Sequence, residues 1–151
     1  MDELDGKLIG FLQTDGRMTN AALARNVGVS EGTVRRRVHR LIESKSITVF
    51  AVPDLTKLGL HISALIGIQV SPDAIDDVSQ KLTALRETEY VGITTGAYDI
   101  FLSVSFASSQ DLAKFLKDKV GRIPGIRRTE TFVNLVVRKR QYSRDFQEVR
   151  V

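Results

Sequence analysis

Residues 19–44, TNAALARNVGVSEGTVRRRVHRLIES, have the pattern of two helices joined by a glycine-containing turn. The first helix is expected over residues 20–26 and ends at Gly28, because glycine tolerates the left-handed backbone that closes many helices. The second is expected to begin after Ser30, a capping residue, and to run to about Ser44. Two helices with a tight turn between them are typical of a helix-turn-helix unit.

The second of these helices is expected to be amphipathic, with arginines opposite its apolar stripe. A helix that enters a groove walled by phosphates needs positive charge on its outward face. Small residues at its start allow it to approach base edges closely. The residues that we expect to contact DNA are Ser30, Gly32, Thr33, Arg36, Arg37 and Arg40.

The residues alone leave two interpretations of this face. A solvated basic helix occurs on many three-helix domains. In the DNA-binding interpretation, Arg36, Arg37 and Arg40 contact phosphates or guanine, and Thr33 approaches a base edge. Ser30 and the amides at the start of the helix bind a phosphate.

The sequence on either side of this pair of helices completes the first domain. Apolar residues at helical spacing predict an earlier helix, which Asp2 is placed to cap. Residues 47–52 alternate and are rich in β-branched side chains, which favours a strand. The expected divisions are a helix-turn-helix domain at 1–46, a connecting strand and linker at 47–60, and a third part at 61–151.

The third part has the pattern of a strand–helix–strand unit that occurs twice. Its order, βαββαβ, is that of the ferredoxin-like split βαβ arrangement. The strands are expected at residues 61–71, 89–94, 99–106 and 126–137. The fold class is therefore α+β, with an N-terminal helix-turn-helix (winged-helix-like) domain and a C-terminal ferredoxin-like βαββαβ domain.

One face of the expected sheet is left without a covering helix. By strand alternation we expect it to carry apolar side chains, which is too much apolar surface to leave in water. This face predicts at least a homodimer. The residues concerned are Leu65, Tyr90, Phe101, Val133 and Leu135.

Composition argues against catalysis and against a metal or cofactor. Among 151 residues there is no Cys, and the only two His are His39 and His61, which leaves little for a zinc site or a Ser-His-Asp triad. The neighbouring carboxylates Asp76 and Asp77 diverge by about 100° on a helix, so they cannot share one substrate atom. We expect no enzyme activity and no cofactor.

The distribution of charged and apolar residues indicates which partners and which cellular location to expect. The chain has 22 Lys and Arg against 18 Asp and Glu, for a net charge of +4, with the two ends basic and the middle mildly acidic. No apolar run approaches the roughly 20 residues needed to cross a bilayer, and the acidic start disfavours a secretory signal. We expect a cytoplasmic protein without a membrane partner. The basic residues near the end (Arg138, Lys139, Arg140 and Arg144) suit either a solvated end or an added contact with DNA or a subunit.

The order and spacing of several short segments resemble the Lrp/AsnC (feast/famine) family of bacterial and archaeal transcriptional regulators. The resemblance covers nearly the whole chain. The segments on which it rests include residues 4–9, 15–19, 27–30, 95–99 and 129–131. The run Arg35-Arg36-Arg37 is a denser basic stretch than the family pattern requires.

The resemblance implies a sequence-specific DNA-binding regulator that forms dimers, commonly assembled into tetramers, octamers or larger rings. It also implies an amino acid or related small-molecule effector, bound between neighbouring C-terminal domains. Backbone groups at a glycine turn would hold its carboxylate, and Asp99 would pair with its ammonium group. The site would combine Thr95, Gly96, Ala97, Tyr98 and Asp99 with Thr129, Glu130 and Thr131 of another subunit.

Other interpretations remain open on the residues. Gly96 would equally serve a plain β-turn, and Asp99 would equally cap that turn or bond to the backbone. An architectural protein that coats DNA with little sequence preference is one functional alternative. A stand-alone small-molecule sensor is another.

Overall fold

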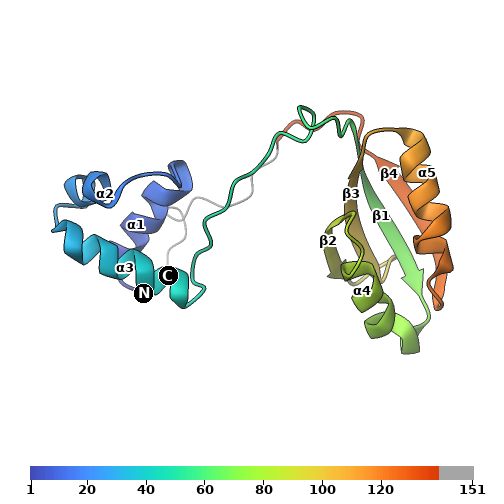
Figure 1. Cartoon of the computed structure of the whole chain (residues 1–151). Coiled ribbons are helices and arrows are strands. Elements are labelled where there is room, and N and C mark those ends of the chain that lie inside the picture. The colour runs from blue at the N-terminus through green and yellow to red at the C-terminus, as the bar shows by residue number, and fades with distance from the viewer. Residues whose placement is uncertain (140–151) are drawn as a thin grey trace. The chain divides into compact units, whose positions relative to one another are not determined.

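The computed structural model of the chain describes residues 1–139, so Arg140 and Arg144, for which the sequence allows a solvated end or an added contact, lie outside the described residues. The chain divides into two compact units (Figure 1). The first contains Met1–Val52 and the second contains Pro53–Arg138. Each unit has its own hydrophobic core.

The first unit consists of three helices, α1 (Glu3–Thr14), α2 (Asn20–Val27) and α3 (Glu31–Glu43). They pack around a small core of buried apolar residues. The expected helix-turn-helix is therefore confirmed. The core residues are Leu8, Leu23, Ala24 and Val34, each at most 7% exposed.

Local hydrogen bonds fix where each of these helices begins. The side chains of Asp2, Thr19 and Ser30 each accept a backbone N–H three residues further on, at 2.9, 3.2 and 3.2 Å. Gly28 closes α2 in the left-handed conformation, with φ of 73°. These caps satisfy backbone donors that would otherwise lack partners in the first turns.

The strand expected at residues 47–52 is wrong for this chain, because this stretch has no regular secondary structure in the described structure. A strand needs a neighbour to accept its hydrogen bonds, and none of the described strands pairs with it. Val49 and Phe50 are 51% and 63% exposed. The helix-turn-helix is thus present without a strand-built wing in the described residues.

The second unit is a four-stranded sheet with the order β2-β3-β1-β4. All neighbouring strands are antiparallel, and the chain follows the βαββαβ course expected of the ferredoxin-like fold. Its elements are β1 (Ile62–Val70), η1 (Pro72–Ala74), α4 (Ile75–Thr83), β2 (Thr88–Ile93), β3 (Ile100–Phe106), α5 (Ser109–Asp118), η2 (Val120–Arg122) and β4 (Ile126–Val133).

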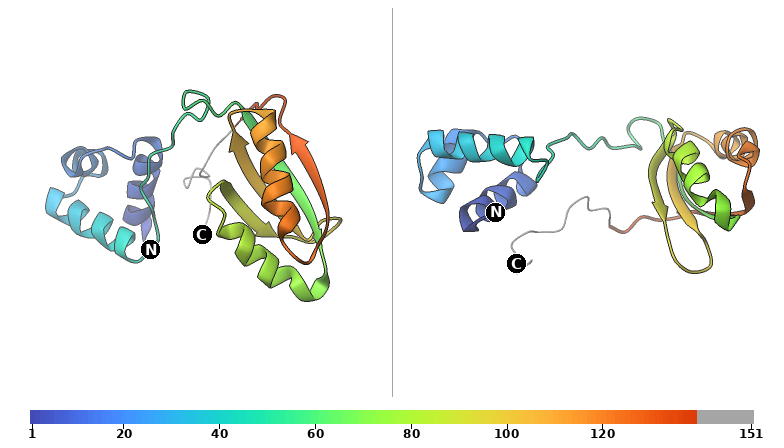
Figure 2. Two further views of the ribbon diagram at one scale, coloured as in Figure 1. Left: turned by 45° about the vertical axis from the view of Figure 1, so that its right-hand side comes forward. Right: turned by 90° about the horizontal axis from the view of Figure 1, so that it is seen from below.

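Helices α4 and α5 cover one face of this sheet (Figure 2). Alternate residues of β1 and β3 point into this layer, as the alternating sequence predicts. Ile66, Ile68 and Leu102 are completely buried there, together with Val78 and Leu82 of α4. Burying such side chains is the main stabilising contribution to this unit.

The uncovered face differs from the expected one at β4. Register pairs Leu65 with Phe132 and Ala64 with Val133, so Phe132 shares the open face with Leu65, and Val133 belongs to the helix-covered side. Leu135 lies beyond the end of β4. The mixed polarity of β4 gives no clean alternation, so only its pairing with β1 fixes which residues face outward.

The two glycines of the helix-turn-helix should respond oppositely to the same substitution. A Cβ at Gly28 or at Gly32 would meet nothing within 4 Å, so neither change is limited by space. Gly28→Ala should lower the free energy of unfolding of this unit by about 1 kcal/mol, because its backbone is left-handed. Gly32→Ala should raise it by about 0.5–1 kcal/mol, because Gly32 is helical. Amide hydrogen exchange within α2 and α3 measures both, and effects of equal sign would contradict these backbone assignments.

Candidate nucleic-acid interface and effector site

The start of α3 is open to solvent within its own unit. Ser30 and Gly32 are exposed, and Thr33 is half-buried. The hydroxyl groups of Ser30 and Thr33 are 2.9 Å apart, so the capping hydroxyl also orients the Thr33 side chain. This end of the helix can approach another molecule without moving a bulky side chain.

Two of the four arginines of α3 carry an uncompensated charge. Arg35 and Arg36 are exposed, and neither has an ion-pair partner among residues 1–139. The structure therefore agrees with an outward Arg36. It also adds Arg35, which the sequence marks only as part of a dense basic run.

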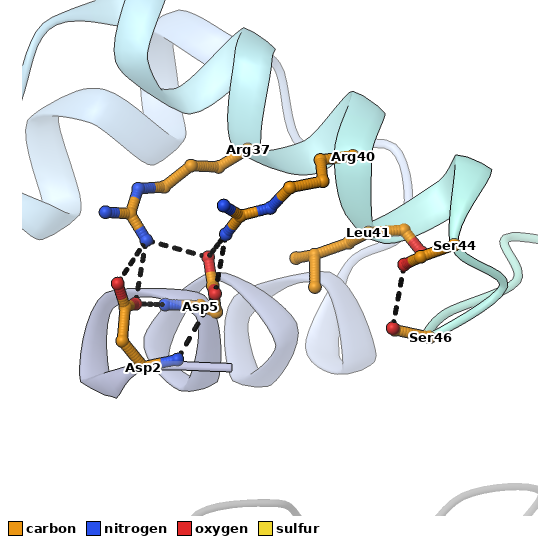
Figure 3. A network of polar contacts seen from close by, with 7 residues as sticks. All are labelled: Asp2, Asp5, Arg37, Arg40, Leu41, Ser44 and Ser46. Carbon is orange, nitrogen blue, oxygen red and sulfur yellow. Dashed lines mark hydrogen bonds and ion pairs between the residues drawn. The ribbon is translucent and has the colours of Figure 1, made fainter.

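The other two arginines form ion pairs within the unit, with Arg37 half-buried and Arg40 still exposed. Arg37 Nη1 donates to both carboxylate oxygens of Asp2, at 2.7 and 2.6 Å, and to Asp5 Oδ1 at 2.9 Å. Arg40 Nη2 donates to both oxygens of Asp5, at 3.2 and 2.9 Å. Figure 3 shows both guanidinium groups reaching from α3 to the start of α1. These ion pairs hold both guanidinium groups against α1, while the Arg40 side chain stays 62% exposed.

The cause is the buried carboxylate of Asp5, which is only 1% exposed. A buried charge needs a partner or hydrogen bonds to offset its lost hydration. The sequence does contain a signal for this. Asp5 falls on the same helical stripe as Leu8 and Leu12, and a carboxylate within an apolar stripe indicates an internal cation.

The same contacts change the titration of the exposed partner. Hydrogen bonds from Arg37 and from the Asp5 backbone lower the pKa of Asp2 from 3.8 to about 2. Because the pKa is lower in the folded state, the pair stabilises the fold fully above about pH 3.8. That contribution is lost as the pH falls toward 2.

The expected effector segment forms the loop between β2 and β3. Its ends are joined by a bond from the Thr94 amide to the Asp99 carbonyl at 2.9 Å and by the Thr94 hydroxyl donating to the Tyr98 carbonyl at 2.8 Å. Gly96 has φ of 109°, a conformation that favours glycine. Thr95, Gly96 and Ala97 form its exposed tip.

Asp99 ties this loop to the end of β1. One of its carboxylate oxygens accepts the Val70 amide at 2.8 Å, and its own amide donates to the Ile68 carbonyl at 2.9 Å. The Gln69 side chain adds a bond to the Ala97 carbonyl at 2.9 Å. The backbone-bonding alternative for Asp99 is therefore what the structure shows for this oxygen.

Tyr98 lies across the open face of the sheet. A Cβ at Gly67 would be 2.7 Å from Tyr98 Cγ, so the ring needs glycine beneath it. The ring meets Phe101 and Phe132 edge-on, at centroid distances of 5.3 and 6.1 Å. Gly67 is absent from the residues predicted from the sequence, although a glycine inside a strand signals close approach of another group.

The phenol of Tyr98 donates a hydrogen bond to the Glu130 carboxylate, which raises the pKa of Tyr98 above its ordinary value. Of the three β4 residues in the expected site, Glu130 thus meets the loop within one chain. Thr129 and Thr131 pair with Ile68 and Ile66, on the opposite side of the sheet from Glu130.

Residues 1–139 contain no group of three or more His, Cys, Asp or Glu placed to hold a metal ion. None of their helices is long and apolar enough to span a membrane.

Together, a capped helix-turn-helix and a ferredoxin-like unit define a class of two-domain regulators that bind DNA. Residues 1–42 match the model of the AsnC-type helix-turn-helix domain. Residues 63–144 match the model of the Lrp/AsnC ligand-binding domain. The chain belongs to the Lrp/AsnC family of transcriptional regulators.

Curated relatives agree with this assignment. An uncharacterized HTH-type transcriptional regulator of Pyrococcus furiosus is 42% identical over 147 residues, which cover 97% of this chain and 99% of the relative. The HTH-type transcriptional regulator FL11 of the same organism is 36% identical over 140 residues, 92% of each chain.

Solved structures share the fold over nearly the whole chain. E. coli AsnC has a TM-score of 0.83 at 30% identity and covers 93% of this chain and 98% of its own. A regulator from Neisseria meningitidis, NMB0573, solved as a complex with L-Met, has a TM-score of 0.88 at 23% identity, with 95% of each chain covered. The second likeness concerns the fold alone.

Removing the buried charge should loosen the helix-turn-helix unit. Asp5→Asn should cost about 2–4 kcal/mol of its unfolding free energy, because Arg37 and Arg40 lose a charged acceptor that is buried. Glu3→Gln is the matched control, since Glu3 is 85% exposed and pairs with Lys7 on its own helix. Its cost should be much smaller, because solvent screens an exposed pair. Amide exchange in α1 and α3 measures both, and equal costs would contradict a special role for Asp5.

Proposed function

We propose that the chain is a sequence-specific transcriptional regulator whose C-terminal domain assembles the oligomer and binds an amino acid or related small molecule. The observation that carries this proposal is the start of α3. There, exposed Ser30 and Gly32 lie beside two arginines, Arg35 and Arg36, without internal ion pairs among the described residues. This combines close access with positive charge, as major-groove docking requires.

In the proposed complex, Arg36 contacts guanine or a phosphate and Thr33 approaches a base edge. Ser30 and the amides at the helix start bind a phosphate. Arg37 and Arg40 keep their place in the interface, but each reaches it while bonded to α1. Their remaining N–H groups are the ones offered to the backbone of the duplex.

The open face of the sheet supports a homodimer, assembled further into a tetramer, octamer or larger form. Leu65, Tyr90 and Phe132 are 37%, 56% and 43% exposed, and the register places them on one face. Apolar side chains grouped in this way favour association with a second copy. A two-fold dimer would read a pseudo-palindromic site, with half-sites about one helical turn apart or a multiple of it.

The loop from Thr95 to Asp99 supports the effector proposal. Its exposed glycine turn leaves backbone groups free to face a ligand carboxylate, while the second oxygen of Asp99 suits an ammonium group. NMB0573, which shares the fold, was solved with L-Met. Thr129, Glu130 and Thr131 of another subunit complete the proposed site.

A binding selection from a random duplex library tests sequence specificity. A shared motif is expected, whereas recovery of no motif would favour a protein that coats DNA.

Arg36→Ala should weaken binding to the selected duplex by about 1–3 kcal/mol if it reads guanine, or lower the salt slope by about one if it contacts phosphate. Arg86→Ala, at an exposed arginine of the second unit, is the control. Equal binding by all three proteins would contradict the proposed docking face.

Thermal denaturation with each common amino acid tests the effector proposal. The expected result is that one amino acid raises the melting temperature and changes the assembly size measured by light scattering, because a ligand of the native state stabilises it. Ala97→Arg, which crowds the exposed loop tip, should abolish that shift, and Ala113→Arg, at an exposed position of α5, should retain it. No shift with any amino acid would contradict an amino-acid effector.

A further inference from the structure

A neutral cluster of four side chains joins the start of α1 to α3. It contains the carboxylates of Asp2 and Asp5 and the guanidinium groups of Arg37 and Arg40 (Figure 3). Every bond that Arg37 makes to these carboxylates leaves from Nη1. A guanidinium has five N–H groups on three nitrogens, so its other donors remain for a further acceptor.

The two carboxylates differ in how firmly they are held. The side chain of Asp5 is 1% exposed and that of Asp2 is 54% exposed, with Arg37 at 24%. Solvent competes strongly for an exposed ion pair and weakly for a buried one. The Arg37–Asp2 contact is therefore the exchangeable member of the cluster, and Asp5 is its fixed member.

A DNA phosphate would present Arg37 with the same kind of acceptor as the Asp2 carboxylate. It is an anion with two oxygens that accept hydrogen bonds from one guanidinium. Arg37 lies on the same helix as Arg36 and one turn after Thr33, so a duplex that reaches the start of α3 brings its backbone to the same flank.

We propose that Asp2 occupies the place of a DNA phosphate in the free protein and yields Arg37 to the duplex on binding. Asp5 meanwhile keeps Arg37 and Arg40 in position. This inference rests on the proposed DNA-binding function. Its consequence is that Asp2 lowers affinity for duplex DNA of any sequence, since each binding event must release its carboxylate.

Asp2→Asn separates this role from helix capping. Asn caps a helix about as well as Asp but carries no charge, so α1 keeps its start. Affinity for a mixed-sequence duplex should rise about twofold to fivefold, the factor that the release of an exposed ion pair allows. Glu3→Gln removes the same charge from the same turn without touching Arg37, and it should give a smaller gain.

A double-mutant cycle with Arg37→Gln completes the test, measured by fluorescence anisotropy at about 50 mM and 200 mM salt. The gain from Asp2→Asn should disappear in the Arg37→Gln background. Asp2→Ser, a second neutral cap, should repeat the result of Asp2→Asn.

The outcomes separate the inference from the function beneath it. Wild-type protein that binds no duplex would overturn the DNA-binding proposal itself. If the wild-type protein binds the duplex but Asp2→Asn weakens affinity, or gains no more than Glu3→Gln, only the role of Asp2 is overturned. A gain that persists with Arg37→Gln would overturn that role as well.

Discussion

A single buried carboxylate, Asp5, governs how the arginine-rich helix sits on its domain. With 1% of its surface exposed, it requires positive charge from within the chain. Arg37 and Arg40 supply that charge from α3. The ion pairs thereby join the first helix to the third and leave Arg35 and Arg36 without an internal ion pair among the described residues. The same ion pairs therefore stabilise the three-helix unit and decide which arginines of α3 have no internal partner among the described residues.

Hydrogen bonds and ring packing likewise hold the loop between β2 and β3 of the second unit in place. Asp99 accepts a backbone amide of β1, and the Tyr98 ring lies over Gly67 with its phenol on Glu130. The loop that the family resemblance assigns to an effector is thus held in place before any ligand arrives. Such preorganisation reduces the ordering cost of binding.

Local signals in the sequence predicted much of this structure. The caps Asp2 and Ser30 and the left-handed Gly28 depend on residues close by in the sequence, and all three are confirmed. What depends on distant contacts was not predictable in the same way. The side chain of Arg37 points toward the carboxylate of Asp5, 32 residues away in the sequence. The side of the sheet on which Val133 lies depends on the pairing of β4 with β1.

Asp5 is proposed to keep Arg37 and Arg40 in position while the exposed side of α3 docks on DNA. A crystal structure of the full chain with a duplex from the binding selection tests this most directly. It should show Arg36 on the duplex and Asp5 still bonded to both Arg37 and Arg40. A duplex seated on another surface, or an Asp5 carboxylate released from both arginines, would contradict this role of Asp5.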